Sequence, residues 1–164
     1  MRTTFTRTDA CRVTPAEYDA WYETDRGRWI GENEHRLLVE LLAPRASERV
    51  LDVGCGTGWF TRRISAMDGL RGTGVYIDAA ALAFARGRDP RTAYGRADAV
   101  RLPFADGSFE RVMSVTALCF VPDWPRALAE IVRVSRDRFV VGLLNRTSLL
   151  RLDNGRDGGR GAYR

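Results

Sequence analysis

The sequence predicts an α/β fold, a parallel sheet of about five strands with helices on both faces. Three observations carry this prediction. Short apolar runs rich in β-branched residues alternate with helical segments of about ten residues from residue 49 onward. The first run leads into a glycine-rich segment, VLDVGCGTG at 50–58, as a buried strand does where it opens into a helix. The length of 164 residues and the apolar fraction of 45% suit one domain with a single core.

Residues 15–43 are expected to form two consecutive helices. Thr14 and Pro15 are typical of a helix start, as the N-cap and the first helical residue. Gly27 is expected to separate this helix from a second one over residues 29–42. The apolar stripe expected on the second helix consists of Leu37, Leu38, Leu41 and Leu42.

The elements that follow are predicted to alternate. The strands are expected at residues 49–53, 73–77, 92–95, 109–115 and 138–144. The helices between and after them are expected at residues 59–67, 79–86 and 125–134. Crossovers of this kind are right-handed and give a parallel sheet, which binds ligands at the carboxyl ends of its strands. The glycine loop follows the first strand, so a binding site is expected there.

The chain is expected to contain three regions. Residues 1–45 form a helical cap, residues 46–150 a cofactor-binding core, and residues 151–164 a flexible tail. The tail has four glycines and four arginines in 14 residues and little apolar surface to bury, which is typical of a flexible segment. The binding site is therefore expected in the core.

The spacing of the glycine loop argues against a dinucleotide ligand. The dinucleotide fingerprint requires a glycine at position 59 after Gly54 and Gly56. Trp59 stands there instead, and the third glycine is Gly58. Asp52 precedes the glycines, where a carboxylate suits the ammonium group of a ligand better than a phosphate. The loop therefore predicts a nucleoside ligand that carries an amino acid.

The composition argues against several other classes of protein. The net charge of +5 comes from arginine alone, and the arginines are interleaved with acidic residues, which is typical of a solvated surface and not of nucleic-acid binding. No apolar stretch is long enough to span a membrane, and the N-terminus lacks the apolar region of a secretory signal, so a cytoplasmic location is expected. Cys11, Cys55 and Cys119 are unevenly spaced and predict neither a disulfide framework nor a metal site.

Four segments carry a resemblance to a known family. They are VLDVGCGTG at 50–58, GVYIDAAALAFAR at 74–86, GRADAVRLPFADGSFERVMSVTALCFVPD at 95–123 and PRALAEIVRV at 125–134. In this order and spacing the chain resembles the class I S-adenosylmethionine-dependent methyltransferases, particularly the small-molecule group that includes quinone-biosynthesis methyltransferases. The resemblance implies a Rossmann-like methyltransferase fold, S-adenosyl-L-methionine as cofactor and S-adenosyl-L-homocysteine as product.

The resemblance also assigns roles to single residues. Asp52 would help to hold the methionine end of the cofactor, which the glycines allow the loop backbone to approach. Asp98 would accept a hydrogen bond from the adenine amino group, with Ala99 donating from its backbone; alternatively, Asp98 caps a helix or turn. Thr116 and Ala117 would border the cofactor and face the acceptor. The positions assigned to the cofactor are Asp52, Gly54, Cys55, Gly56, Gly58, Tyr76, Ile77, Asp78, Asp98, Ala99, Thr116 and Ala117.

The chain departs from the family at the ribose position. The family carries an acidic residue at the end of the second strand, about 20 residues after the glycines, and here that position is Tyr76. The acid comes two residues later as Asp78, which shares a face with Tyr76 if the strand continues. Either Asp78 reaches the ribose, or Tyr76 offers one hydroxyl or lies against the adenine.

Three aromatic residues are candidates for a lid over the substrate. Tyr18, Trp21 and Tyr22 share one helical face, and the resemblance implies that the N-terminal helices close over the cofactor; the alternative is that these side chains only pack onto the sheet. The sole histidine, His35, is expected to be a solvated helix residue and not a base. No catalytic base and no metal ligand are assigned.

The chain stops before the final β-hairpin that the resemblance would lead one to expect. The last strand is then expected to be an exposed parallel edge. Either the chain is a fragment, or another protein or a second copy of the chain, as a homodimer, covers that edge. The function predicted is methyl transfer from S-adenosylmethionine to a small organic acceptor. The alternative is a truncated or degenerate methyltransferase fold that acts as a non-catalytic binding or assembly module.

Overall fold

The computed structural model describes residues 13–144 and contains one parallel five-stranded sheet. The strands are β1 (Arg49–Val53), β2 (Arg71–Tyr76), β3 (Ala93–Arg96), β4 (Phe109–Val115) and β5 (Ser135–Gly142). The helices are α1 (Pro15–Trp21), α2 (Asp25–Leu42), α3 (Trp59–Ser65), α4 (Ala79–Arg88) and α5 (Trp124–Val134), with a 3₁₀ turn η1 (Leu118–Phe120). The strand order is β3-β2-β1-β4-β5, so the predicted Rossmann-like α/β fold is confirmed.

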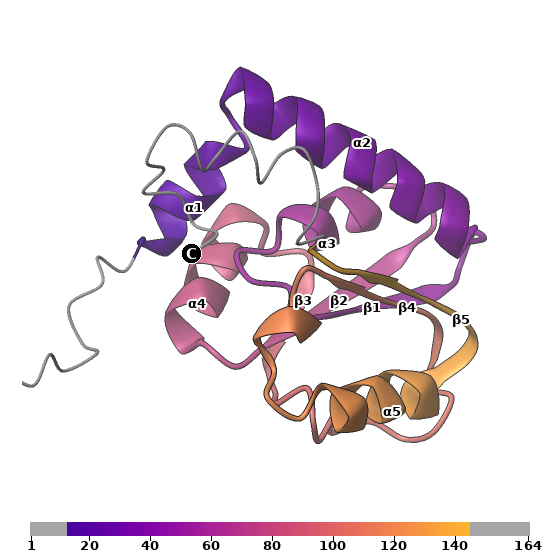
Figure 1. The fold of residues 1–164 in the computed structure, drawn as a ribbon. Helices are drawn as coiled ribbons and strands as arrows, with labels where there is room; N and C mark the ends of the chain where they lie inside the picture. Colours follow the sequence, from indigo (N-terminus) through magenta and orange to yellow (C-terminus); the bar gives the residue numbers. More distant parts are fainter. Residues whose placement is uncertain (1–12, 145–164) are drawn as a thin grey trace, which may run out of the picture.

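Helices cover both faces of the sheet (Figure 1). On one face, Leu38 of α2 and Ile64 of α3 pack into a core with Val50 of β1. On the other face, Ile131 of α5 packs into a second core with Val112 of β4. The two cores share the central strands, which places β1 and its glycine loop in the middle of the molecule.

The break between the first two helices differs from the prediction. Gly27 lies buried inside α2, and the chain turns before it, where the Thr24 hydroxyl accepts a hydrogen bond from the Gly27 backbone N–H at 3.0 Å. A Cβ atom at Gly27 would lie 2.0 Å from the Trp21 carbonyl oxygen. The glycine is therefore required by the close approach of the end of α1, and the predicted helix break at Gly27 is wrong.

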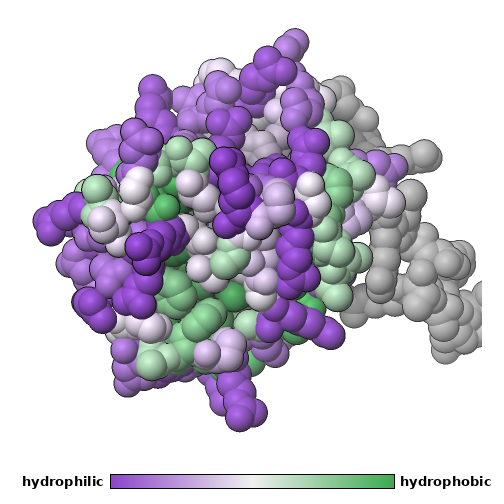
Figure 2. Space-filling view, turned by 180° about the vertical axis from the view of Figure 1, so that it is seen from behind, coloured by the Kyte–Doolittle hydropathy of each residue, from purple (hydrophilic) through white to green (hydrophobic). Residues whose placement is uncertain are grey.

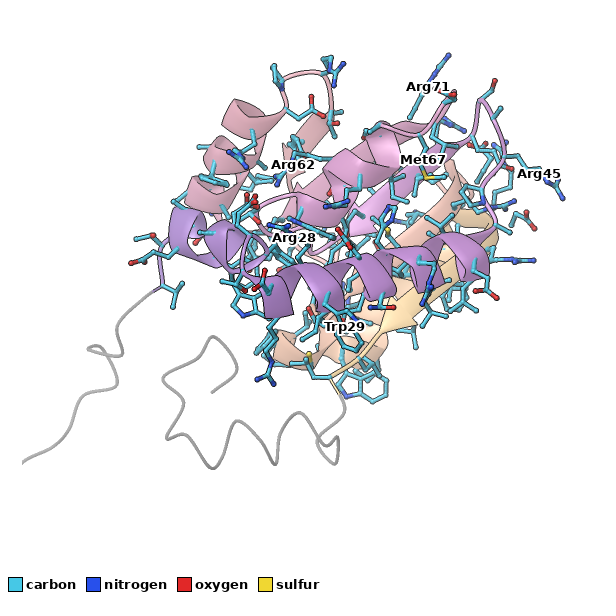
Figure 3. All side chains as sticks on the ribbon, turned by 90° about the horizontal axis from the view of Figure 1, so that it is seen from above. Arg28, Trp29, Arg45, Arg62, Met67 and Arg71 are labelled. Carbon is cyan, nitrogen blue, oxygen red and sulfur yellow. The ribbon has the colours of Figure 1, made fainter. Side chains whose placement is uncertain are left out.

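The apolar stripe predicted on α2 is only half buried. Leu38 and Leu42 are in the core, whereas Leu37 and Leu41 are 54% and 47% exposed. Leu41 lies near β5, where an Arg138 guanidinium N–H donates to its carbonyl at 2.9 Å. Trp29 is also exposed and points away from the core (Figure 3). Within residues 13–144, β5 pairs only with β4 and forms one edge of the sheet.

Several predicted boundaries move or fall outside the range that the structure describes. The strand β5 begins at Ser135, directly after α5, and not at residue 138. Residues 1–12 of the predicted cap, residues 145–150 of the predicted core and the predicted tail lie outside the described residues. No helix among residues 13–144 is long and apolar enough to cross a membrane. Hydrophilic residues are spread over the face shown in Figure 2.

Candidate active site

A cavity of about 820 Å³ lies at the carboxyl ends of β1, β2 and β4. It is of the size that small-molecule sites usually have. The glycine loop after β1 forms its centre, and the N-terminal part of α1 contributes to its lining. This is the place where a parallel sheet binds ligands, so the site expected from the sequence corresponds to a real hollow.

The cavity brings together eleven of the twelve positions assigned to the cofactor: Asp52, Gly54, Cys55, Gly56, Tyr76, Ile77, Asp78, Asp98, Ala99, Thr116 and Ala117. Gly58 is not among the lining residues. It precedes α3 with a φ of +77°, and a Cβ there would lie 2.6 Å from the Tyr94 hydroxyl oxygen. The glycine thus allows the loop to pack against β3, and its contact with a cofactor stays a prediction.

The glycine loop is held in place by backbone hydrogen bonds and leaves room in front of it. The N–H groups of Gly54 and Cys55 donate to the Val75 carbonyl at 2.8 and 3.0 Å. Gly56 has a φ of +55°, and a Cβ there would meet no atom within 4 Å, so this part of the loop faces open space. The Thr57 hydroxyl lines the cavity, is buried and has no hydrogen-bond partner among residues 13–144. An open loop and an unpartnered hydroxyl fit a polar ligand such as the amino-acid end of S-adenosylmethionine.

Asp52 places a buried carboxyl group at the floor of the cavity. It is 2% exposed, and within the described range its carboxyl group accepts one hydrogen bond, from the Thr61 hydroxyl at 2.6 Å. Burial raises the pKa of Asp52 to about 7, against the opposing effect of the Thr61 hydrogen bond. Burial also raises the pKa of the neighbouring Cys55 thiol, which therefore stays protonated. A carboxyl group with this pKa is available to receive a cation near neutral pH.

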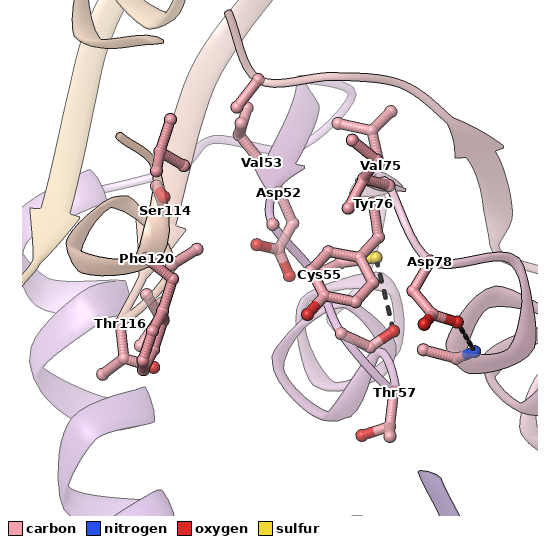
Figure 4. A pocket seen from close by; sticks show the side chains of 18 of the residues that line it. Asp52, Val53, Cys55, Thr57, Val75, Tyr76, Asp78, Ser114, Thr116 and Phe120 are labelled. Carbon is pink, nitrogen blue, oxygen red and sulfur yellow. Dashed lines mark hydrogen bonds between the residues drawn. The ribbon is translucent and has the colours of Figure 1, made fainter. Parts of the chain in front are cut away.

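Asp78 leaves the strand and caps a helix. The strand β2 ends at Tyr76, and Asp78 is the N-cap of α4. One carboxylate oxygen of Asp78 accepts from the backbone N–H groups of Ala80 and Ala81 at 2.7 and 3.1 Å (Figure 4). The other carboxylate oxygen has no hydrogen-bond partner among residues 13–144, and Asp78 lines the cavity. Tyr76 and Asp78 therefore both remain candidates for the ribose.

Asp98 caps a turn and also lines the cavity, so its role toward the adenine stays a prediction. One of its carboxylate oxygens accepts from the Val100 backbone N–H at 3.1 Å, so Asp98 caps a turn. The residue also lines the cavity next to Ala99. Capping uses one oxygen and leaves the second one for a ligand.

The N-terminal aromatic residues divide between the cavity and the core. Tyr18 and Tyr22 line the cavity, whereas Trp21 does not. Tyr22 stacks on Trp59, with ring centroids 4.4 Å apart and planes 18° from parallel. Trp59 and Phe60 also line the cavity, and neither was assigned to the site from the sequence, although they follow the glycine loop directly. The aromatic rings thus both pack and bound the site.

A buried ion pair ties α1 to the glycine loop. Asp19 is 3% exposed and accepts from the Arg62 guanidinium at 3.0 and 3.2 Å. The same guanidinium donates to the Thr57 carbonyl at 2.6 Å, so Arg62, labelled in Figure 3, links the helix to the loop. Arg88 of α4 lies 3.5 Å from the second oxygen of Asp19. This network was missed because 43 residues separate Asp19 from Arg62.

His35 is not the solvated residue that the sequence predicts. It is half-buried, and burial, together with the nearby Arg63, lowers its pKa. Its Nε2 atom is buried without a partner among residues 13–144, and His35 does not line the cavity. Within that same range, no group of three or more side chains is arranged to hold a metal ion.

Several residues at and just after the end of β4 line one side of the cavity. Four of them are here called the β4 wall: Ser114, Thr116, Phe120 and Asp123. In Figure 4 the first three lie across from Tyr76 and Asp78. Thr116 has a φ of +53°, a left-handed conformation that costs a β-branched residue about 1–3 kcal/mol and that concentrates at functional sites. Ser114 could have been identified as a site residue from the sequence, because it is a polar residue within the apolar run VMSV. No local sequence pattern identifies Phe120 or Asp123 as site residues.

Comparisons with known proteins agree with this geometry. The family model described as a methyltransferase domain matches residues 51–138, more than half of the chain. A malonyl-[acyl-carrier protein] O-methyltransferase from Erwinia pyrifoliae is 39% identical over 99 residues, covering 60% of this chain and 37% of the relative. A demethylmenaquinone methyltransferase from Beutenbergia cavernae is 37% identical over 101 residues, covering 62% of this chain and 42% of the relative.

A solved structure is similar over a larger share of the chain. It is an S-adenosylmethionine-dependent methyltransferase from Thermotoga maritima, with a TM-score of 0.70 and 27% identity, covering 90% of this chain and 67% of that one. The chain spans about two fifths of the length of the curated relatives that it matches. The chain therefore belongs to the methyltransferase domain family.

Proposed function

We propose that this chain binds S-adenosylmethionine in the cavity and transfers its methyl group to a small organic acceptor. The observation that carries the proposal is the convergence of four separate segments on one cavity, through Asp52, Asp78, Asp98 and Thr116. The relatives named above act on different acceptors, a malonyl-[acyl-carrier protein] and a demethylmenaquinone, so family membership leaves the acceptor open.

Methyl transfer from S-adenosylmethionine depends mainly on how the cofactor and the acceptor are positioned. S-adenosylmethionine supplies a methyl group on a sulfonium, which is a good leaving group for an in-line displacement. Asp52 is placed to receive the ammonium of the methionine end, and the glycine loop lets backbone N–H groups approach it. Tyr18 and Tyr22 bound the cavity from the side of α1, where they exclude water. No residue is assigned as a base.

Calorimetric titration with S-adenosylmethionine and with NAD tests the proposal. We expect micromolar binding of S-adenosylmethionine and none of NAD, because the loop lacks the dinucleotide spacing. Tight binding of NAD alone would contradict the proposal. Binding of S-adenosylmethionine without transfer of its labelled methyl group to any member of a broad acceptor panel would favour the alternative of a non-catalytic module.

The ribose contact is tested by two substitutions. Asp78→Ser keeps an N-cap for α4 but removes the free carboxylate oxygen, and Tyr76→Phe removes only the hydroxyl. If Asp78 holds the ribose, we expect Asp78→Ser to raise the dissociation constant of S-adenosylmethionine about tenfold or more, as loss of a charge-assisted hydrogen bond does. Tyr76→Phe is then expected to change it by less than about threefold. The reverse ranking would assign the ribose to Tyr76.

The cytoplasmic location and the homodimer stay predictions. The observation that supports the homodimer is that β5 has only one strand partner within residues 13–144, which leaves backbone groups available for pairing. Light scattering at several protein concentrations measures the oligomeric state, and a monomer at all of them would rule the homodimer out.

A further inference from the structure

The cavity has an unusual charge for so basic a chain. Its lining within residues 13–144 contains four carboxyl groups and no arginine, lysine or histidine, although the chain has a net charge of +5. The four are Asp52, Asp78, Asp98 and Asp123. A hollow lined by one sign of charge raises the local concentration of ligands of the opposite sign. The described part of the cavity therefore favours cations.

One of these carboxylates is not used by the proposed cofactor site. Asp52, Asp78 and Asp98 are allotted to the methionine, ribose and adenine parts, whereas Asp123 has no such role. It is the N-cap of α5, and one of its oxygens accepts from the Arg126 backbone N–H at 3.3 Å. The other oxygen has no hydrogen-bond partner among residues 13–144.

The β4 wall also offers apolar surface and a polar anchor. Phe120 lines the cavity yet is 65% exposed, so much of its apolar surface is available to a ligand. The Ser114 hydroxyl is fully buried at the same wall and lacks a hydrogen-bond partner among the described residues. An exposed ring, an unpartnered hydroxyl and a carboxylate are together suited to an organic cation with an apolar body.

We propose that the β4 wall is the acceptor subsite and that it selects organic cations over organic anions, with Asp123 as the residue that sets this specificity. The inference rests on the proposed function, which assigns Asp52, Asp78 and Asp98 to the cofactor and leaves Asp123 without a role. An anionic acceptor would approach several carboxylates without a basic side chain from residues 13–144 to receive it. A cationic acceptor would meet Asp123 and the ring of Phe120. The proposal concerns the charge of the acceptor and not the atom that is methylated.

Three phenols of similar size and different charge test the proposal. Tyramine is a cation at pH 7.5, 4-ethylphenol is neutral and 4-hydroxyphenylacetate is an anion. Each is titrated by NMR into the full chain saturated with S-adenosylhomocysteine. We expect tyramine to bind about tenfold more tightly than 4-hydroxyphenylacetate, with 4-ethylphenol between them.

Two variants separate the local contact from the overall charge. Asp123→Asn keeps an N-capping side chain and is expected to reduce the preference for tyramine about threefold. Asp68→Asn makes the same change in net charge at an exposed residue that does not line the cavity, and it is expected to leave the preference unchanged. An equal effect of the two substitutions would overturn the role of Asp123.

The outcomes distinguish this inference from the proposed function. A preference for 4-hydroxyphenylacetate, or equal or undetectable binding of all three phenols, overturns the inference while binding of S-adenosylhomocysteine upholds the cofactor site. If neither S-adenosylmethionine nor S-adenosylhomocysteine binds, the proposed function fails. The same titrations without cofactor then still measure the charge preference, and a preference for tyramine that Asp123→Asn reduces would support the subsite.

Discussion

Replacing Asp52 with asparagine is expected to make the folded protein less sensitive to alkaline pH and, at the same time, to abolish tight binding of S-adenosylmethionine. Asp52 is buried at the floor of the cavity, and burial raises its pKa to about 7, whereas an aspartate in an unfolded chain has a pKa of about 4. The folded state therefore binds more protons than the unfolded state between these two values.

The sign of the pH dependence follows from this difference. The contribution of Asp52 to stability is fully present below about pH 4 and is lost as pH rises through about 7. We expect the free energy of unfolding of the unliganded protein to fall by about 2–3 kcal/mol from this group between pH 5 and pH 8. In Asp52→Asn this part of the fall disappears, because the amide does not titrate.

Urea denaturation at pH 5 and pH 8 measures the effect. The readout is the change in unfolding free energy between the two pH values, since a buried amide also shifts the absolute stability. Asp68→Asn serves as the control, because Asp68 is exposed and should leave the pH dependence as it is in the wild type. Parallel pH profiles of the wild type and Asp52→Asn would show that Asp52 does not titrate in this range.

The affinity for the cofactor is expected to change with pH in the opposite direction to the stability. An ammonium group next to Asp52 favours the carboxylate, so binding of S-adenosylmethionine should strengthen as pH rises from 6 to about 8 and release a proton near the lower value. Calorimetry in buffers of different ionisation enthalpy detects that proton. Asp52→Asn should bind weakly and without this pH dependence, and a wild-type affinity in that variant would remove Asp52 from the cofactor site.

The largest loss of stability is expected from Asp19→Ala. This change removes one partner of a buried ion pair and leaves the Arg62 guanidinium, which is 17% exposed, without its carboxylate. Breaking such a pair costs about 3–5 kcal/mol, and we expect about 3 kcal/mol because Arg62 keeps its bond to the Thr57 carbonyl. The same change frees α1, which contributes Tyr18 to the cavity, so the affinity for S-adenosylmethionine should also fall.

A neighbouring carboxylate provides the matched control. Glu23 pairs with Arg88 at 3.8 Å but is 67% exposed, so Glu23→Ala should cost less than about 1 kcal/mol. The difference between the two variants in urea midpoint measures the buried pair. Equal midpoints would mean that Asp19 is no more important to the fold than a surface carboxylate.

Much of the central sheet was predictable because its signals are local. An apolar run followed by glycines marks β1 and its loop, and the apolar stripe of residues 125–134 marks α5. The carboxyl-end rule for parallel sheets predicts a site after β1, and the cavity there collects all the assigned positions except Gly58.

The failures are of a different kind. Gly27 has the propensity of a helix breaker, but the close approach of α1 requires a glycine within α2. Leu37 reads as a core residue, but the direction in which α2 crosses the sheet leaves it on an exposed flank. His35 reads as solvated, yet it is half-buried on the same helix. In each case the outcome depends on a neighbour that is distant in sequence or on the orientation of the helix.

The sequence alone determined the fold class, the family and the location of the glycine loop, because these depend on periodicity and on residues within a few positions of one another. Only the tertiary structure decided that Asp52 is buried enough to titrate near pH 7, that Asp19 reaches Arg62, and that Asp123 faces the cavity. Desolvation, ion pairing and the sign of charge in a cavity depend on atoms brought together from separate segments. No single stretch of the chain contains that information.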